Sequence, residues 1–332
     1  MISRDRKVVD MLSYDVKVGY SCNNRCKHCV IDDSKDKLIA QKEKIDLSTD
    51  ECLSLIKNAA KNNADGVVLT GGEVSIRKDF DVLLNECLKN NLAITVQTNG
   101  RRFATDSMIR LIKPIKNIRF IIALHGSNAS THDAITQIKG SFAETCSAIQ
   151  KLRQINKFVV IKVVISKINM KELPDLVSLV AKLRAQYICF AFPHGQGAAR
   201  KNFEEVIPRY NDLKPIFESL IQIAHNNKIN VEFETVPFCI IPKHMKLVGE
   251  LKYLKGSAMF TQVREDTKDW NDVRHSIKKK PGTCQSCAMN SICEGPWNEY
   301  IHTFGGNEFK PIILGNDQKR LLKKAIEIFM KE

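Results

Sequence analysis

The sequence predicts an α/β protein built on parallel strands. Short apolar or alternating segments, which are typical of strands, take turns with longer segments that have the periodicity or the caps of helices. Six such strand–helix units follow one another between residues 14 and 227. Because a helix that connects neighbouring parallel strands makes a right-handed crossover, this alternation predicts parallel strands connected in that way.

The first strand is expected at residues 14–20, where polar and apolar residues alternate. Residues 31–45 are polar and rich in lysine, which indicates an extended surface loop. Ser48 and Glu51 have the spacing of a capping box, which predicts a helix from there to about residue 62. The apolar run at 66–70 predicts a strand that is buried on both faces.

The same alternation continues to residue 227. Ser141 and Glu144 form a second capping-box pattern at the start of a helix over 141–156. Pro208 and Pro215 are expected to bend or interrupt the helical region 203–227. The other strands are expected at 92–97, 118–124, 158–165 and 187–192, and the other helices at 79–90, 107–112 and 172–184.

The pattern changes after residue 228, so we divide the chain into 1–228, 229–315 and 316–332. The later parts are expected to contain a strand at 229–236, a polar and weakly periodic stretch at 249–280, a strand-like segment at 299–304 and an amphipathic helix at 318–330.

The composition is ordinary for a globular protein, with 43% hydrophobic and 27% charged residues among 332. No apolar run reaches the roughly 18 residues that a membrane span needs. Residues 1–7 lack the apolar region of a signal peptide, and only a short segment precedes the first predicted strand. These features predict a cytoplasmic protein with no membrane partner.

The formal net charge is +14, but charge alone does not identify a partner. Nucleic acid is not favoured, because the lysines are spread along the chain and no module of basic and aromatic residues stands out. An acidic reductant such as flavodoxin or ferredoxin, or an anionic substrate, fits the charge equally well. A solvated basic surface is a further explanation. The oligomeric state is not predicted.

Eleven cysteines in a reducing compartment indicate metal binding or catalysis rather than disulfides. Cys22, Cys26 and Cys29 have the spacing C-x3-C-x2-C directly after the first predicted strand. Such a loop fits an iron–sulfur cluster or zinc. Three cysteines would leave one iron of a cluster without a protein ligand, whereas zinc would need a fourth ligand, for which His28 is available.

This spacing, at this position, resembles the radical S-adenosylmethionine (radical SAM) enzymes. The resemblance implies a 4Fe–4S cluster on Cys22, Cys26 and Cys29, with SAM bound to the open iron. In that family, one-electron reduction cleaves SAM and gives a deoxyadenosyl radical, which abstracts hydrogen from the substrate. The resemblance also implies that residues 1–228 form a partial (β/α)6 TIM-like barrel.

Two further motifs fit the family's SAM site. Gly71, Gly72 and Glu73 end the second predicted strand and resemble the family's Gly-Gly-Glu-Pro, which holds the amino group of SAM. Val74 replaces the proline. Thr98 and Asn99 end the third strand, and the resemblance implies that they lie near the ribose or carboxylate of SAM. A plain Asn-Gly turn explains these two residues equally well.

Leu124-His125-Gly126, His132-Asp133 and Gly140-Ser141-Phe142 resemble a stretch of the peptide-maturing members. Those members usually have aspartate in place of His125, and arginine in place of Thr136. The arginine often contacts the SAM carboxylate, and Lys162 and Arg200 are possible replacements for it here. His125 is expected either to touch substrate or SAM, or to be an ordinary loop histidine.

Two later segments also match the family. Gly195, within the glycine-containing loop 192–198, resembles the segment that lets backbone lie beside the adenine, although a flexible loop explains it as well. Cys239, Cys284, Cys287 and Cys293 resemble the SPASM or twitch domains, which implies that residues 229–315 hold one auxiliary 4Fe–4S cluster. A structural zinc on the same thiols is the alternative. The remaining cysteines are expected to be packing residues: Cys52, Cys87, Cys146 and Cys189.

These motifs predict a radical SAM enzyme that matures a ribosomally made peptide. The alternative is a radical SAM enzyme that acts on a small molecule or a nucleotide. A third hypothesis, a non-catalytic redox carrier or zinc scaffold, leaves Gly71-Gly72-Glu73 without a role. With only about thirteen residues before the first strand, no fused leader-binding domain is expected at the N-terminus. No residue is assigned as the catalytic acid or base.

Overall fold

The computed structural model describes residues 12–254, 258–263 and 266–331. The expectation about residues 1–7 therefore lies outside the described part of the chain. Within that part, one sheet has the strand order β7-β6-β5-β4-β3-β2-β1-β8-β9. All neighbouring pairs are parallel except β8 and β9, which are antiparallel. The predicted α/β class with parallel strands is confirmed.

The strands are β1 (Leu12–Lys17), β2 (Gly66–Thr70), β3 (Ala93–Thr98), β4 (Ile118–Ala123), β5 (Phe158–Val164), β6 (Tyr187–Ala191), β7 (Asn230–Glu234), β8 (Ala258–Val263) and β9 (Asp266–Asp269). The helices are α1 (Asp32–Ala40), α2 (Thr49–Lys61), α3 (Phe80–Lys89), α4 (Asp106–Ile112), α5 (Ala129–Thr136), α6 (Ser141–Gln154), α7 (Leu173–Lys182), α8 (Ala198–Lys201), α9 (Phe203–Val206), α10 (Tyr210–Asn226), α11 (Leu251–Leu254), α12 (Trp270–Ile277), α13 (Asn298–Phe304) and α14 (Asn316–Lys331).

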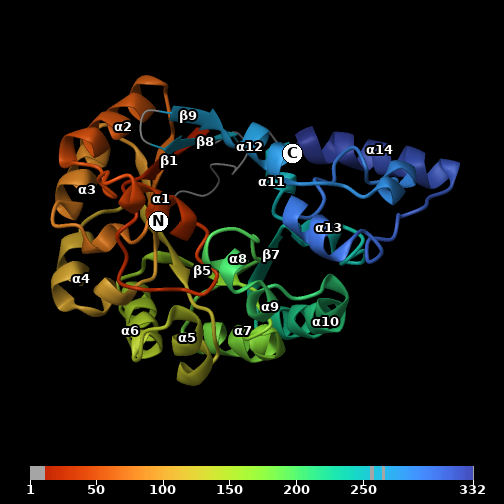
Figure 1. Cartoon of the computed structure of the whole chain (residues 1–332), viewed down its shortest axis with the longest axis horizontal. Helices are drawn as coiled ribbons and strands as arrows, with labels where there is room; N and C mark the ends of the chain where they lie inside the picture. The colour runs from red at the N-terminus through yellow and green to blue at the C-terminus, as the bar shows by residue number, and fades with distance from the viewer. Residues whose placement is uncertain (1–11, 255–257, 264–265, 332) are drawn as a thin grey trace.

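The core lies between the outer face of the curved sheet and the helices that surround it (Figure 1). In β4, Ile118, Phe120 and Ile122 are buried, whereas the alternate residues are exposed or half-buried. The same alternation in β2 leaves Val68 half-buried, so the prediction of burial on both faces is wrong for that strand. One face of the sheet thus packs against helices, and the other lines the partly open interior of the barrel.

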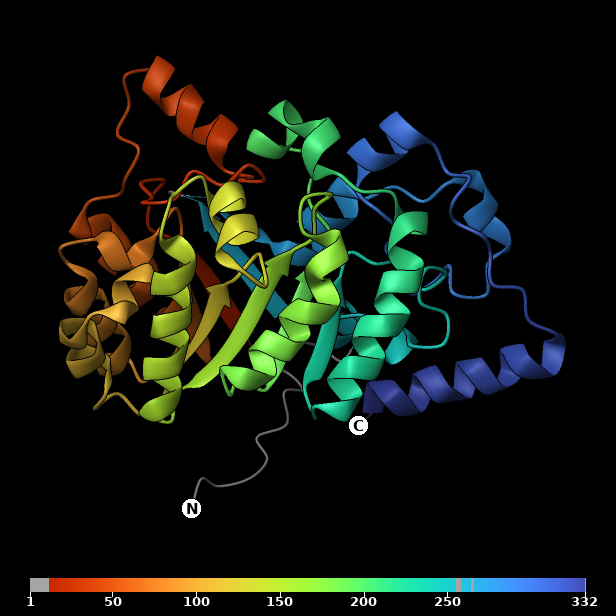
Figure 2. The ribbon, with the colours of Figure 1, turned by 90° about the horizontal axis from the view of Figure 1, so that it is seen from below.

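The loops that follow the carboxyl ends of the strands gather at one edge of the sheet. Figure 2 shows α1 and α8 together at this edge, while α14 lies near the opposite edge. Asp33 of α1 accepts a hydrogen bond from the Gly197 N–H, and Lys201 pairs with Asp32 and Asp36. Segments that are far apart in the sequence are therefore joined where a barrel of this kind places its active site.

Several local predictions are confirmed. The capping box of Ser48 and Glu51 opens α2, and helices form close to the predicted 79–90, 107–112 and 318–330. The chain breaks between α9 and α10 around Pro208, whereas α10 continues through Pro215.

Other local predictions are wrong. Residues 31–45 are not a loop throughout, because they contain α1. Ser141 and Glu144 form no capping box: Asp133 accepts the Gly140 and Phe142 N–H groups, and Glu144 pairs with Arg101. Residues 299–304 form helix α13 rather than a strand.

The sheet does not end at the boundary predicted at residue 228. The expected strand at 229–236 forms as β7 and pairs with β6. The stretch predicted to be weakly periodic contains β8, which pairs with β1. Parts of residues 229–263 therefore belong to the barrel sheet. Within the described residues, no helix has both the length and the apolar character that crossing a bilayer requires.

An aromatic cluster fixes the C-terminal segment against the barrel. Tyr300 of α13 packs edge-on against Phe192, which follows β6, and against Tyr210 of α10. The Tyr210 N–H donates to the Tyr300 hydroxyl, and the Trp297 indole N–H donates to the Phe192 carbonyl. These buried contacts hold the segment that follows Cys293 beside the mouth of the barrel (Figure 1).

Candidate functional site

The loop that carries the first three cysteines follows β1 and is held by hydrogen bonds to its backbone. The Asp46 carboxylate accepts the N–H groups of Tyr20 and Ser21, both at 2.9 Å. The Arg77 guanidinium donates to the carbonyls of Val18, at 3.0 Å, and Leu47, at 2.9 Å. The loop is therefore already ordered where it leaves the strand.

Two glycines let the end of β2 lie directly against this loop. The Gly72 N–H donates to the Gly19 carbonyl and the Glu73 N–H to the Ser21 carbonyl, both at 2.8 Å. A Cβ on Gly72 would lie 2.2 Å from the Ser21 oxygen, and Gly71 has a φ of 148°. The close backbone approach that the glycines permit is therefore made by the chain's own cysteine loop.

The middle of the cysteine loop is fixed from two other elements. Arg101, just after β3, donates to the Asn23 carbonyl at 2.6 Å and to the Asn24 side chain at 3.0 Å. Asn99 donates through Nδ2 to the Asn23 side chain at 2.7 Å. The end of α5 accepts from the loop as well, since the Arg25 N–H donates to the Thr136 carbonyl at 3.0 Å. Thr136 thus contacts the loop through its backbone.

The three thiols of this loop lie together in a desolvated position. Burial raises the pKa of Cys22 to about 11, and the charges of Glu73 and Cys29 add to the effect. Burial raises the pKa of Cys26 too, with further contributions from Cys29 and Cys22. All the cysteines are free. Clustered thiolates need a cationic partner, so this donor set fits a soft metal centre such as an iron–sulfur cluster.

Glu73 is buried beside the thiols, and its carboxylate is mostly occupied. Oε1 accepts the Ser75 N–H at 3.0 Å and the hydroxyls of Ser75 and Thr98, each at 2.6 Å. Oε2 accepts the Asn99 N–H at 2.7 Å. Because a carboxylate oxygen has two lone pairs, Oε2 retains room for one further donor. The structure thus brings Glu73, Thr98 and Asn99 together next to Cys22.

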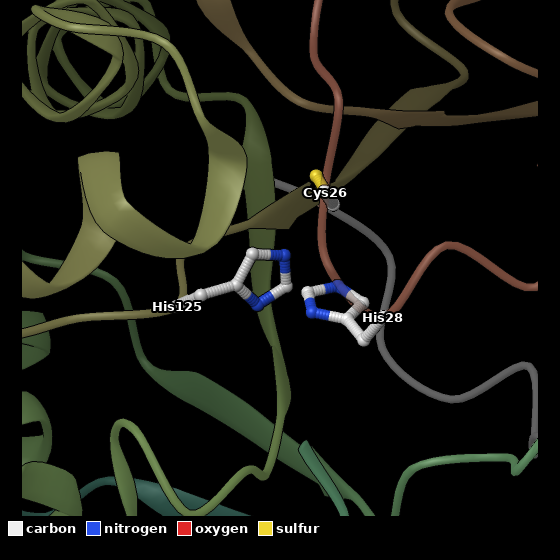
Figure 3. Close-up of side chains that lie close together, drawn as sticks. All are labelled: Cys26, His28 and His125. Carbon is white, nitrogen blue, oxygen red and sulfur yellow. The ribbon is translucent and has the colours of Figure 1, made fainter. Parts of the chain in front are cut away.

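Histidines line the other side of Cys26. His28 and His125 face each other edge-on, with their ring centroids 4.4 Å apart, and one nitrogen of each lies within 4.8 Å of the Cys26 sulfur (Figure 3). His132 stacks on His125 with centroids 6.0 Å apart. Burial lowers the pKa of both His28 and His132 to about 4. A neutral imidazole, that of His28, therefore lies beside the Cys26 thiol.

Two of these imidazoles have a buried nitrogen without a hydrogen-bond partner within the described structure: Nδ1 of His28 and Nε2 of His132. Unpaired buried polar atoms are costly, and they often mark the position of a group that the protein binds. These atoms, together with the clustered thiols, fit a cluster whose sulfurs accept hydrogen bonds.

The two basic residues proposed as replacements for the arginine are engaged elsewhere. Lys162 of β5 pairs with Glu234 of β7, inside the barrel. Arg200 pairs with Asp33 at 3.0 Å, and its side chain is 67% exposed.

Gly195 and Gly197 belong to the loop that follows β6. A Cβ on Gly195 would lie 3.1 Å from the Glu299 side chain, whereas one on Gly197 would lie 2.2 Å from the Cys29 carbonyl oxygen. Gly197 has a φ of 59°, and the Ala198 N–H donates to the same carbonyl at 2.8 Å. This loop therefore spans the distance between the cysteine loop and the C-terminal segment.

The second group of cysteines lines a single pocket in the C-terminal segment. Cys239 follows β7, and Cys284, Cys287 and Cys293 come from the segment after α12. Burial raises the pKa of Cys239 to about 12, and the charges of the other three thiols raise it further. Four mutually close thiols fit a fully ligated metal centre. Of the cysteines expected to pack, Cys52, Cys87 and Cys189 are buried and Cys146 is half-buried.

Sequence reasoning missed the residues that hold the loop, such as Asp46, Arg77 and Arg101. No local pattern identifies them, because each acts on backbone that lies far away in the sequence. It also missed the position of His28 beside Cys26 and the stacking of His132 on His125, although both histidines stand in motifs that it singled out.

Fold and site together define a class of protein that binds a metal centre at the mouth of a partial barrel. A family model described as the radical SAM superfamily matches residues 16–180. The chain belongs to the radical SAM superfamily. This family implies a 4Fe–4S cluster and SAM, and the three clustered thiols fit the cluster.

Several curated proteins are similar in sequence. The AdoMet-dependent heme synthase of Methanosarcina barkeri is 24% identical, over 86% of this chain and 90% of that protein. The mycofactocin maturase MftC of Mycolicibacterium smegmatis is 28% identical, over 55% of this chain and 45% of that protein. The subtilosin biosynthesis protein AlbA of Bacillus subtilis is 27% identical, over 60% and 47%. The chain thus spans about half the length of these two relatives.

Solved structures share the fold. Streptococcus suis SuiB bound to S-adenosylmethionine superposes with a TM-score of 0.63 at 15% identity, over 92% of this chain and 76% of that chain. The protein anSMEcpe, solved with AdoMet and a peptide, gives a TM-score of 0.61 at 13% identity, over 96% of this chain and 98% of that chain. The partial-barrel fold predicted from the resemblance is therefore confirmed.

Proposed function

We propose that this chain is a radical SAM enzyme whose cluster is held by Cys22, Cys26 and Cys29. The observation that carries the proposal is the half-buried group of three thiols beside Glu73, at the carboxyl ends of β1 and β2. When bound, the cluster and SAM would supply one-electron cleavage of the sulfonium and a carbon radical able to take hydrogen from a substrate. Three thiolates would leave the fourth iron free for SAM.

We assign the recognition of SAM to residues around the three thiols of the first cysteine loop. The free lone pair of Glu73 Oε2 is suited to the ammonium of the methionine moiety, since a carboxylate accepts charge-assisted hydrogen bonds. Thr98 supports Glu73 by donating to Oε1. Gly71 and Gly72 place the carboxylate by packing on the cysteine loop. Asn99, His125 and the backbone at Gly195 are proposed as further neighbours of SAM.

Lys162 is a weaker candidate for the SAM carboxylate. Its ammonium is held by Glu234, so it would have to leave that partner to reach SAM. Because its side chain points into the barrel interior, a contact with substrate fits its position better.

We assign an auxiliary 4Fe–4S cluster to Cys239, Cys284, Cys287 and Cys293. The support is the number of thiols and their convergence on one pocket with apolar walls such as Met289 and Phe309. Zinc on the same ligands is the competing assignment. Iron and zinc analysis of protein purified without oxygen distinguishes the two assignments. Two 4Fe–4S clusters would give about eight irons per chain, whereas one cluster and a zinc site would give about four irons and one zinc.

The proposed substrate is a ribosomally made peptide. The support comes from the relatives named as maturases, from SuiB, which has been solved with its precursor peptide SuiA, and from the motif that ends in Gly140-Ser141-Phe142. A low-potential reductant such as flavodoxin or ferredoxin would supply the electron, and the basic surface suits such an acidic partner.

A small-molecule substrate is the second candidate, because one relative is matched almost from end to end. The heme synthase is aligned over 90% of its length, whereas MftC is aligned over 45%. On that basis a porphyrin precursor of heme is the small molecule to test first.

The activity is tested by adding reductant and SAM to anaerobically reconstituted protein. Release of deoxyadenosine is expected, and none is expected when reductant is left out. Intact clusters without any release would overturn the proposal and favour a redox carrier.

The substrate class is tested by adding candidate peptides or porphyrins to the same reaction. The true substrate should accelerate deoxyadenosine release and change its own mass. Acceleration by a porphyrin and by no peptide encoded beside the gene would replace the first candidate with the second.

A further inference from the structure

His125 lies beside Cys26, and hydrogen bonds to neighbouring parts of the barrel fix its position. It follows β4, and its main-chain carbonyl accepts from Asn169 Nδ2 at 2.8 Å. Its main-chain N–H donates to Nδ1 of His132 at 3.0 Å. The residue is only 3% exposed. Its main chain is therefore held in place by α5 and by the loop that follows β5.

The proton of the His125 ring can be located from its partners. The Val164 N–H, at the end of β5, donates to His125 Nδ1 at 3.2 Å. A nitrogen that accepts a hydrogen bond carries no proton, so the proton is on Nε2. A flipped ring would leave the Val164 N–H without an acceptor, which is costly at a buried position. Figure 3 shows the second ring nitrogen on the edge that turns toward Cys26.

We propose that His125 donates its Nε2–H to the sulfur side of the cluster held by Cys22, Cys26 and Cys29, and so raises the reduction potential of that cluster. This inference rests on the proposed function and assigns a positioning and tuning role within the same site.

The physical basis is the charge difference between the two oxidation states. The reduced cluster carries one more negative charge than the oxidised cluster, so a hydrogen bond to its sulfur stabilises the reduced form more. Hydrogen bonds to sulfur are among the factors that set the potential of iron–sulfur proteins. A neutral N–H donor raises the reduction potential without the cost of placing a charged side chain in a buried site.

The same three side chains could in principle form a separate metal site, since Cys26, His28 and His125 offer donors within 4.8 Å of one another. That assignment would remove Cys26 from the thiol group and leave the half-buried Cys22 and Cys29 without a cation. Cluster binding uses all three thiols and leaves the imidazoles as hydrogen-bond donors. The geometry therefore favours a role for His125 around the cluster rather than in its own metal site.

The test is a redox titration of the reconstituted cluster in the absence of both SAM and substrate, followed by electron paramagnetic resonance. Omitting SAM separates an effect on the cluster from any contact between His125 and SAM. The signal of interest is the one that is absent in Cys26→Ala and that changes when SAM is added afterwards. The variants are His125→Leu, His125→Gln, which restores an N–H donor, and His194→Leu, which replaces a half-buried histidine that stacks on Trp297.

His125→Leu is expected to lower the ratio of reduced to oxidised cluster about tenfold at a given potential, equivalent to about 59 mV for one electron. His125→Gln and His194→Leu should stay close to the wild type. An unchanged potential in His125→Leu, or an equal fall in His125→Gln, would overturn the inference.

A measurement on the wild type covers the case in which His125→Leu loses its cluster. With ¹⁵N-labelled histidine, pulsed resonance of the reduced wild-type cluster should show a weakly coupled imidazole nitrogen that His125→Gln lacks. Absence of that coupling would overturn the inference, while the proposed function would stand. A wild type with no cubane at this loop would instead overturn the proposed function.

Discussion

The two cysteine groups differ in how the rest of the chain supports them. The first loop is held by side chains from distant elements, including Asp46, Arg77 and Arg101. The second group lies largely within one segment, where the Cys287 N–H donates to the Cys284 carbonyl and the Cys287 sulfur accepts from the Ile312 N–H. The first group has three thiols and unpaired imidazole nitrogens, whereas the second has four thiols.

This contrast indicates different tasks. A group one ligand short of a closed site, placed at the mouth of a barrel, suits the binding of a reactive partner. A closed group of four thiols suits a centre that does not exchange ligands. The predictions below test this division, from the largest expected effect to the smallest.

Cys26→Ala is expected to abolish reductive cleavage of SAM, because it removes one of only three thiolates at the first group. Cys287→Ala should retain at least part of the cleavage, because the auxiliary cluster proposed for Cys287 would not touch SAM. The measurement is deoxyadenosine release with an excess of chemical reductant, which bypasses any electron supply through the second cluster. Normal cleavage in both variants would show that the roles of the two groups are wrongly assigned.

Glu73→Gln is expected to weaken SAM binding by about 10- to 100-fold, since a hydrogen bond to a charged group contributes about 1.5–3 kcal/mol. The amide loses the negative charge opposite the ammonium of SAM. Binding is measured by calorimetry on anaerobic protein that retains its cluster. Glu86→Gln, a side chain that contacts Asn90 on the surface of α3, is the control and should bind normally. Equal affinity in Glu73→Gln would remove this residue from the SAM site.

The parts of the site that could be predicted from the sequence are those in which a few adjacent residues determine the chemistry. The thiol spacing and Gly71-Gly72-Glu73 are of this kind, as is the Ser48 capping box. The side chains that hold the loop could not be predicted from the sequence, because Arg101, for example, donates to the Asn23 carbonyl, 78 residues away. A side chain that donates to distant backbone leaves no local pattern.

Two elements show why parts of the fold were missed. β8 lies in a polar stretch, and it becomes a strand by pairing with β1, where Phe260 stacks on Tyr14 at 5.2 Å. In α13, aromatic and β-branched residues such as Tyr300, Ile301 and Phe304 favour a strand, yet the rings of Tyr300 and Phe304 lie 4.9 Å apart. A strand would separate residues four apart by about 13 Å. Packing against the barrel therefore overrides the local pattern.

Gly72→Ala is expected to destabilise the protein by about 1–3 kcal/mol and to reduce cluster retention, because the added Cβ would lie 2.2 Å from the Ser21 oxygen. Gly282 near the second group supplies the matched control, since nothing lies within 4 Å of its Cβ position. Gly282→Ala should change stability by no more than about 0.5 kcal/mol. Chemical unfolding and iron content are measured for both. Similar behaviour of the two variants would contradict the close packing at the first loop.

Tyr300→Phe tests the attachment of the second group to the barrel, and the smallest effect on iron content is expected here. Its hydroxyl accepts the Tyr210 N–H and donates to Glu308, so its loss leaves the buried Tyr210 amide without this acceptor, whereas Glu308 keeps its bonds from Arg209 and the Asn211 N–H. A loss of about 1–3 kcal/mol in unfolding free energy is expected. The thiols of both groups are untouched, so iron content should stay at the wild-type value. Loss of the second cluster in this variant would show instead that the barrel takes part in holding it, and the division between the two regions would be less sharp than their ligands indicate.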